Sequence, residues 1–336
     1  MRLLALLNKR SGLKPDQSTT AMVIEAARRY GHSWVAGVSG ASLDESGDVS
    51  FNAIRITPEL ASTREALRAL RLSKAEPVSS RDLDVVLIRT NPGRDRERAV
   101  LHETLLNLCR IAQSRGVVVL NDPRALPKAS DKLFLSYLPE ALRPRMIVSR
   151  DAARLIAFVE ETKGPTVLKP LFGTQGRGVF KVTGGNTNLA ALVEVLTSEG
   201  YVIAQDYLRR APEGDRRIIV VDGKPLEVDG KTCAVRRKPT DGEFRSNVHL
   251  GGTPMKAESS PAVIRAAALI GEVLIEHGIW MAGIDLVGTK AVEVNVRSPG
   301  GIIDAAQFEG ADFIGAVLDS VLAKVESRDG GRPSPL

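Results

Sequence analysis

Two carboxylates and an amide near the C-terminal end of the chain have the spacing of ligands for a divalent cation. The stretch WMAGIDLVGTKAVEVNV alternates apolar and polar residues, and it predicts a β-hairpin with its loop at 288–290. In that register Asp285 and Glu293 face each other, and Asn295 lies two residues further along the same face. Opposed carboxylates repel, whereas a few protein oxygens completed by water and phosphate suit Mg²⁺. The hairpin therefore predicts a cation site, unless the loop is shifted by one residue or the face is simply hydrated.

A lysine at the end of an apolar strand, followed by a glycine-rich loop, is the second chemical feature. In TVLKPLFGTQGRGVFKV, Lys169 ends the apolar run, and Gly173, Gly176 and Gly178 follow it. Glycine lets a backbone approach a ligand closely, and backbone N–H groups can cradle phosphate beside a lysine. The Walker pattern GxxxxGKS or GxxxxGKT is absent, so the loop alone is weak evidence. Together with the carboxylate hairpin, it predicts a nucleoside triphosphate site.

These groups need strands to hold them, and the first third of the chain alternates strand and helix signals. Strands are expected at 3–7, 82–89 and 117–122, and helices at 18–31 and 99–116. This rhythm predicts a doubly wound parallel sheet, whose ligands bind at the carboxyl ends of the strands. Arg89 lies at such an end, either as a ligand-binding residue or as a solvated loop charge.

The remainder of the chain reads as antiparallel strands with helices, so the α/β fold becomes α+β in its C-terminal part. Asp222-Gly223 is a type I′ turn signal between two strands. Helices are expected at 150–164, 189–200, 261–278 and about 313–324. The predicted division is an N-terminal domain at 1–123, a central domain at 124–204, a C-terminal domain at 205–328 and a disordered tail at 329–336.

Composition excludes several classes of function. The chain of 336 residues is 43% hydrophobic, yet it has no apolar run near the roughly 18 residues of a membrane span. Cys109 and Cys233 are far apart, which argues against a disulfide framework and favours the cytoplasm. The net charge of +6 suits small anionic ligands. Aromatic residues make up only 4%, which disfavours a nucleic-acid partner.

The chain resembles ATP-grasp ligases, and specifically the bacterial glutathione synthetase family. The resemblance covers nearly the whole length through DQSTTAMVIEAARRYG, DLDVVLIRTNPGRD, NDPRALPKASDKLF, VLKPLFGTQGRGVF, VIAQDYL, GDRRIIVVDGKPL, FRSNVHLGG and GIDLVGTKAVEVNVRSPGG. It implies an ATP-grasp fold and an ATP-dependent carboxylate–amine ligase working through an acyl phosphate. The implied reaction joins γ-glutamylcysteine to glycine, giving glutathione, ADP and phosphate.

The same resemblance implies roles for individual residues. The implied ATP-binding residues are Lys132, Lys169, Gly173, Thr174, Gln175, Gly176, Gln205, Tyr207, Leu208 and Asp215. The implied catalytic residues are Lys169, Arg217 and Asn247. The implied substrate-binding residues are Arg89, Arg245, Asn247, Ser298 and Gly300. The implied ligands of Mg²⁺, or of Mn²⁺ in its place, are Asp285, Glu293 and Asn295.

This chemistry needs no protein nucleophile, because positioning and charge neutralisation carry both steps. Cys109 is therefore expected in the core, and of the histidines only His249 is placed near substrate. The stretches NKRSGLKPDQS, SPGGIIDA and TCAVRRKPTDGEF depart from the family pattern near the substrate end. They keep open a paralogue that joins a different small peptide or amino-acid pair. A non-catalytic nucleotide- or nucleic-acid-binding protein is the third reading. The family resemblance also implies a homo-oligomer, a tetramer or a dimer.

Overall fold

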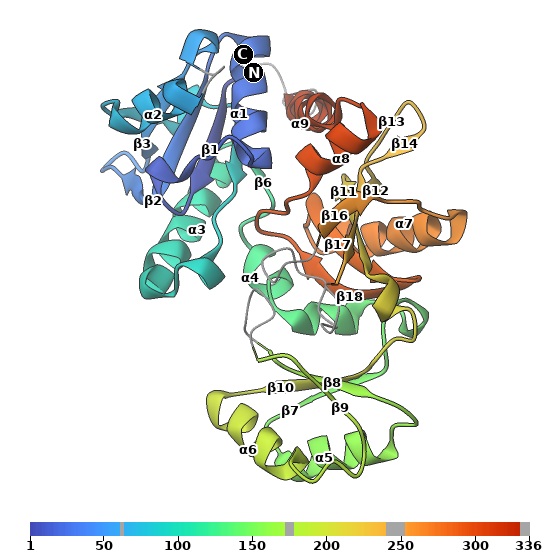
Figure 1. Cartoon of the computed structure of the whole chain (residues 1–336). Coiled ribbons are helices and arrows are strands. Elements are labelled where there is room, and N and C mark those ends of the chain that lie inside the picture. The colour runs from blue at the N-terminus through green and yellow to red at the C-terminus, as the bar shows by residue number, and fades with distance from the viewer. Residues whose placement is uncertain (61–63, 172–177, 240–252, 330–336) are drawn as a thin grey trace.

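The structure is a computed structural model that describes residues 1–60, 64–171, 178–239 and 253–329. Three parts follow one another along the chain, each built on its own main sheet (Figure 1). Within these described ranges, no helix has the length and apolarity that a membrane crossing needs.

The N-terminal sheet has the strand order β4-β3-β2-β1-β5-β6. Its strands are β1 (Leu3–Leu7), β2 (Ser33–Leu43), β3 (Val49–Ile56), β4 (Glu76–Ser79), β5 (Val85–Ile88) and β6 (Val118–Leu120). Its helices are α1 (Ser18–Tyr30), α2 (Arg64–Leu72) and α3 (Ala99–Ser114). The three predicted strands run parallel, as expected, and β2 is also parallel to β1.

The purely parallel sheet is the wrong part of this prediction. Strand β3 pairs antiparallel with both β2 and β4, so the sheet is mixed. The hairpin was missed because β2 contains Gly37 and Gly40, which interrupt its apolar pattern, and its pairing with β3 shifts register between Ala36 and Ala41. An antiparallel edge on a parallel sheet is common in α/β proteins. Because β1 and β5 are parallel, their carboxyl ends lie at the same edge of the sheet. Open α/β sheets bind their ligands at that edge.

The central sheet has the order β7-β10-β8-β9. Its strands are β7 (Met146–Ser149), β8 (Thr166–Pro170), β9 (Phe180–Val182) and β10 (Val202–Asp206), and α5 (Ala152–Glu161) and α6 (Leu189–Glu199) cover one face (Figure 1). The two helices and the sheet share a separate apolar core. The chain enters and leaves this part side by side, since the Asp206 N–H donates to the Arg145 carbonyl at 3.0 Å.

The linker before the central sheet packs elsewhere. It forms α4 (Leu126–Ala129) and the 3-10 helices η6 (Lys132–Tyr137) and η7 (Glu140–Leu142). Phe134 and Leu135 lie in the same core cluster as Ile284 and Leu286 of the C-terminal sheet. We therefore propose that the central domain spans 146–206 rather than 124–204.

The C-terminal sheet has the order β16-β15-β11-β17-β18. Its strands are β11 (Asp215–Val221), β15 (Ala234–Lys238), β16 (Thr253–Lys256), β17 (Met281–Val287) and β18 (Lys290–Asn295), with the short β12 (Lys224–Pro225) paired to β11 and a separate ribbon of β13 (Glu227–Val228) and β14 (Lys231–Thr232). The predicted turn is confirmed, because Val221 pairs with Lys224 and both Asp222 and Gly223 have positive φ. Helix α7 (Pro261–Glu276) packs on this sheet, and α8 (Ile302–Glu309) and α9 (Phe313–Asp329) follow it.

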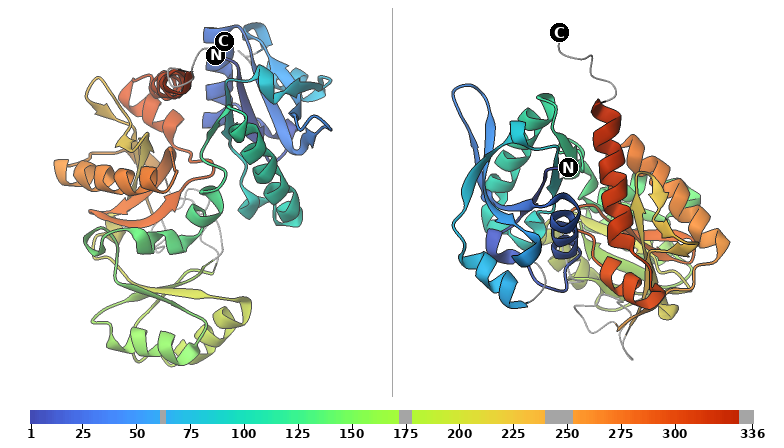
Figure 2. Two further views of the ribbon diagram at one scale, coloured as in Figure 1. Left: turned by 180° about the vertical axis from the view of Figure 1, so that it is seen from behind. Right: turned by 90° about the horizontal axis from the view of Figure 1, so that it is seen from above.

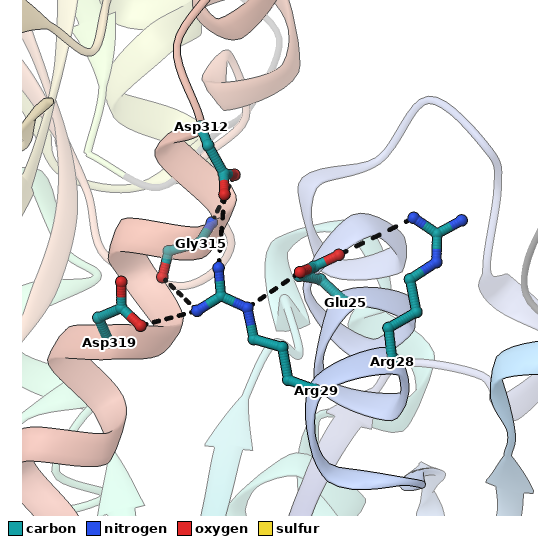
Figure 3. A network of polar contacts seen from close by, with 6 residues as sticks. All are labelled: Glu25, Arg28, Arg29, Asp312, Gly315 and Asp319. Atoms are coloured by element: carbon teal, nitrogen blue, oxygen red, sulfur yellow. Dashed lines mark hydrogen bonds and ion pairs between the residues drawn. The ribbon is translucent and has the colours of Figure 1, made fainter.

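Helix α9 returns to the N-terminal domain and lies beside α1 (Figure 2). Phe313, Val317 and Val321 of α9 share one apolar cluster with Met22 and Val23 of α1. Polar contacts border this seam (Figure 3). The Arg29 guanidinium contacts Glu25 on its own helix and Asp312 and Asp319 from the other side. The first and last described helices therefore form one packed pair.

Candidate functional site

The C-terminal hairpin has the predicted pairing but a different loop. Asp285 pairs with Glu293, and Gly283 pairs with Asn295, as the sequence predicted. The loop is Gly288-Thr289 alone, because Val287 already pairs with Lys290. The register shifts next to Asp285, which leaves Val292 as an extra residue on β18. This bulge compensates for the shorter loop and restores the carboxylate pair.

The bulge also gives Lys169 a partner. The Val292 carbonyl accepts a hydrogen bond from the Lys169 Nζ at 3.2 Å. Next to it, the Lys132 Nζ donates to the carbonyls of Pro170 and Leu171 at 3.2 and 3.0 Å. The two lysines that the sequence singled out therefore lie together, one from η6 and one from β8. They face the hairpin of β17 and β18.

Both lysine side chains are costly to keep charged where they lie. Burial lowers the pKa of Lys169 to about 8, while nearby Glu293 raises it and Lys132 lowers it. Burial also lowers the pKa of Lys132, and Glu293 again acts in the opposite direction. The half-buried carboxylate of Glu293 thus stabilises the charged forms of both Lys132 and Lys169. Additional negative charge from a ligand would stabilise both.

Asp285 belongs to a buried ion network on one face of the sheet. Its carboxylate accepts two bonds of 2.7 Å from Arg217, and the Arg237 Nη2 lies 2.8 Å away. Arg237 also donates two bonds of 2.7 Å to Asp215. Although burial alone would raise it, the charges of Arg217 and Arg237 hold the pKa of Asp285 below its usual range. Two acids and two arginines neutralise each other.

This network corrects the reason given for a cation at the hairpin. The charge of Asp285 is compensated by arginines, so the opposed carboxylates do not by themselves demand a metal ion. The Asn295 Nδ2 also donates to Asp285 at 3.1 Å, which leaves the amide oxygen of Asn295 for another partner. In the described part of the chain, no three His, Cys, Asp or Glu side chains meet in a metal-binding group. Glu293 and the Asn295 oxygen nevertheless fit Mg²⁺, which takes few protein ligands when phosphates supply the rest.

The predicted adenine hinge lies where the chain leaves the central sheet. Gln205 is buried on β10, and its Oε1 has no hydrogen-bond partner among the residues described. The Tyr207 N–H donates to the Pro165 carbonyl at 2.9 Å, and the Leu208 carbonyl accepts from Ala211 at 2.9 Å. These two backbone groups are already used, whereas the Gln205 Oε1 is left without a partner among the described residues. The ribose contact of Asp215 stays a prediction, since its carboxylate is engaged by Arg237.

Arg89 is a buried residue, so its interpretation as a solvated loop charge is wrong. Only 8% of it is exposed, and burial lowers its pKa to about 10. Its Nε donates to the Thr19 Oγ1 at 3.0 Å, and its Nη2 donates to the Pro299 carbonyl at 3.3 Å. Pro299 lies between Ser298 and Gly300, both of which are exposed. The structure thus brings three of the predicted substrate-binding residues into one region.

A close backbone approach makes this arrangement possible. A Cβ on Gly283 would lie 3.0 Å from the Pro299 Cβ and 3.4 Å from the Arg217 Cδ. Glycine at position 283 therefore lets the loop after β18 rest on β17. Gly178, which follows the glycine-rich loop, has φ +67° and packs against Pro170.

Some of the predicted site residues lie outside the described residues. These are Gly173, Thr174, Gln175, Gly176, Arg245 and Asn247, and His249 with them. Cys109 is buried in the core, as predicted, and Cys233 is buried too.

Sequence reasoning missed three residues near the site. Arg237 completes the ion network, and Arg297 lies in the loop after β18. Asn121, at the end of β6, donates to the carbonyls of Met281 and Val296 at 2.9 and 2.8 Å and accepts from the Met281 N–H. Arg237 and Arg297 stand in the basic stretch AVRRK and in NVRSPGG, where their charge was the only available signal.

The fold is shared with solved ATP-grasp ligases. The ligase PsnB, complexed with a minimal precursor, has a TM-score of 0.62 and 19% identity, covering 95% of this chain and 98% of that chain. The D-cycloserine synthetase DcsG has a TM-score of 0.61 and 17% identity, covering 97% and 99%. These similarities show that the chain has the ATP-grasp fold.

Sequence comparison narrows the class to one family. The N-terminal domain model of prokaryotic glutathione synthetase matches residues 1–126, and its ATP-grasp domain model matches residues 131–310. The chain belongs to the prokaryotic glutathione synthetase family. It is 34% identical to a glutathione synthetase of Parasynechococcus marenigrum over 305 residues, covering 90% of this chain and 92% of the relative. It is 32% identical to a glutathione synthetase of Prochlorococcus marinus over 328 residues, covering 97% and 100%.

Proposed function

We propose that this chain is an ATP-dependent ligase that joins γ-glutamylcysteine to glycine and forms glutathione. The observation that carries the proposal is the convergence of Lys132 and Lys169 beside Glu293, through their hydrogen bonds to the backbone next to Lys169 and next to Glu293. This point adjoins the loop that Arg89 contacts through Pro299. This arrangement supports adjacent sites for a triphosphate and for a carboxylate substrate. The family models cover almost the whole chain.

Lys132 and Lys169 hold the phosphates of ATP, and Gln205 contributes to the adenine site. Glu293 and Asn295 hold a divalent cation, Mg²⁺ or Mn²⁺, together with phosphate oxygens and water. When bound, the cation supplies positive charge that neutralises the phosphate oxygens. Asp285, whose oxygens are engaged by two arginines, keeps Arg217 facing the same region. Arg89 binds the peptide donor, and Ser298 and Gly300 bind the acceptor amino acid.

The reaction has two steps that balance without a protein nucleophile. In the first, a carboxylate oxygen of γ-glutamylcysteine attacks the γ-phosphorus of ATP, and the bond to the ADP oxygen breaks. In the second, the glycine amine attacks the acyl carbon, loses a proton and expels inorganic phosphate. The lysines and arginines stabilise negative charge in both steps and keep the reactants in position.

The direct test supplies the full chain with ATP, Mg²⁺ and γ-glutamylcysteine, with and without glycine. We expect phosphate release to require both substrates and the product to have the mass of glutathione. A panel of other dipeptides and amino acids tests the paralogue alternative, which the basic Arg236-Arg237 strand and the Arg297 loop favour. If another pair is used with a higher kcat/KM, the glutathione assignment is overturned while the ligase class stands.

Glu293→Gln is expected to raise the Mg²⁺ concentration for half-maximal activity about tenfold, because one charged ligand is lost while Asn295 and the phosphates remain. The melting temperature should change little, since repulsion from Asp285 and attraction to the two lysines are lost together. Steady-state rates across a Mg²⁺ titration measure the first effect, and a metal-free thermal melt measures the second. An unchanged Mg²⁺ dependence would remove Glu293 from the proposed metal site.

When nucleotide binds near pH 8 to 9, the protein is expected to take up a proton. In the free protein Lys169 has a pKa of about 8, and a bound triphosphate raises that pKa by favouring the ammonium form. Affinity for ATP should therefore fall as the pH rises above about 8. Calorimetry in buffers of different ionisation enthalpy measures the uptake, and Lys169→Arg should abolish it, because arginine stays protonated. Equal uptake in that variant would assign the proton to another group.

We further propose that the protein works in the cytoplasm, in keeping with two buried free thiols. A homo-oligomer, either a tetramer or a dimer, remains a prediction that analytical ultracentrifugation would test.

A further inference from the structure

Arg297 is a half-buried cation without an anionic partner among the described residues. It follows β18 directly, and its Nε donates to the Ser130 Oγ at 2.6 Å. Its Nη1 is buried and has no hydrogen-bond acceptor within the described ranges. Arginine stays protonated in proteins, so the Arg297 side chain carries its positive charge at neutral pH. A charged group with one such enclosed and unbonded nitrogen is costly unless something pairs with it.

The acid that pairs with His102, a residue that the charge of Arg297 also reaches, is already engaged. Asp95 lies 2.6 Å from the Arg98 Nη2 and 2.9 Å from the His102 Nε2. Burial lowers the pKa of His102, Asp95 raises it, and the charge of Arg297 lowers it further. Asp95 therefore has two partners of its own, and Arg297 has no ion pair with an acid within the described part of the chain.

The position of Arg297 links the two ends of the site. Ser130, which fixes its Nε, is two residues before Lys132 at the phosphate end. On its other side Arg297 is followed by Ser298, Pro299 and Gly300, the loop that Arg89 contacts. An amine that attacks an acyl phosphate must approach between these two ends. The carboxylate of an α-amino acid lies only one carbon from that amine.

We propose that Arg297 binds the carboxylate of the acceptor amino acid and determines the preference for an acceptor that carries one. This inference rests on the proposed function. The guanidinium presents a planar edge of N–H donors, which suits a carboxylate in two-point contact. Ser130 holds one nitrogen, so the remaining edge is oriented before the ligand arrives. The acceptor carboxylate completes the charge pair that the described residues leave open.

The test compares glycine with glycinamide, which lacks the negative charge but keeps the amine and the size. Rates are measured with the full chain, ATP, Mg²⁺ and γ-glutamylcysteine for the wild type, Arg297→Ala and Arg297→Lys. We expect Arg297→Ala to lower kcat/KM for glycine about 10- to 100-fold, mainly through KM. The same variant should lower kcat/KM for glycinamide less than about threefold, so that the preference collapses. Arg297→Lys should restore part of it.

Arg216→Ala is the matched control, since Arg216 is a half-buried arginine on β11 of the same sheet, and its Nε donates to the Glu258 carbonyl. This variant should leave the ratio of kcat/KM for glycine to kcat/KM for glycinamide unchanged. If Arg297→Ala melts at a lower temperature, Arg297→Met keeps the aliphatic stem and repeats the comparison. An equal loss with glycine and glycinamide would overturn the inference, because it would indicate contact with the acyl phosphate or a structural role. An unchanged KM for glycine would overturn it as well.

Failure of the proposed function gives a different result. In that case the wild type does not release phosphate with γ-glutamylcysteine and glycine. The comparison is then made with the best acceptor of the amino-acid panel and its amide, and Arg297 is judged by the same ratio.

Discussion

Asp285→Ala is expected to lower the free energy of unfolding by about 3–5 kcal/mol, the usual cost of removing one partner from a buried ion network. The side chain of Asp285 is 1% exposed and accepts from Arg217, Arg237 and Asn295. Without it, Asp215 is the one carboxylate left in this network to compensate the charges of Arg217 and Arg237. Urea unfolding followed by circular dichroism, with a parallel thermal melt, measures the change.

Glu293→Gln is the matched control, because it alters the carboxylate directly across the strand pair. We expect it to melt close to the wild type, although both variants remove one negative charge. Asp285→Asn should fall between the two, since its amide oxygen still accepts one arginine bond. If Asp285→Ala unfolded at the wild-type urea concentration, the network would not be a source of stability.

Lys169→Met is expected to lower kcat/KM about 10²- to 10³-fold, the effect typical of removing a donor that stabilises transition-state charge. Lys169 is 7% exposed, and burial lowers its pKa to about 8. Keeping this ammonium group charged and buried therefore costs folding free energy. Methionine has a similar length without the charge, so the variant should melt at or above the wild-type temperature.

Steady-state rates with varied ATP separate binding from catalysis for this variant. Lys163→Met is the control, because Lys163 is an exposed lysine in the loop before the same strand. It should behave as the wild type. A Lys169→Met protein with full activity would remove the lysine from the phosphate site, and a large drop in melting temperature would show that its role is structural.

The parts of this site that the sequence predicted depend on local chain geometry. The pairing of Asp285 with Glu293 follows from alternation along one hairpin, and the turn at Asp222-Gly223 follows from its two residues. The three parallel strands of the N-terminal domain were also predictable from local sequence patterns. Each of these signals lies within about 15 residues of sequence, where periodicity and turn chemistry decide the structure.

The parts that were missed depend on pairings between distant strands. Arg217 meets Asp285 because β11 lies beside β17, and Arg237 joins them because β15 lies on the other side of β11. No local pattern encodes that register. The bulge at Val292 was hidden likewise, since a shorter loop and an extra residue give the same opposed pair. The unpaired state of Arg297 becomes visible only when the neighbours of its side chain are known.

The pairing of α9 with α1 has a consequence for the order of events during translation. One face of the N-terminal domain is covered by Phe313, Val317 and Val321, which leave the ribosome long after Leu120 of β6. Until then Met22 and Val23 lack their final apolar neighbours, so the domain synthesised first is completed last. Nascent chains arrested before residue 313 should therefore be more sensitive to protease and bind more chaperone than released ones.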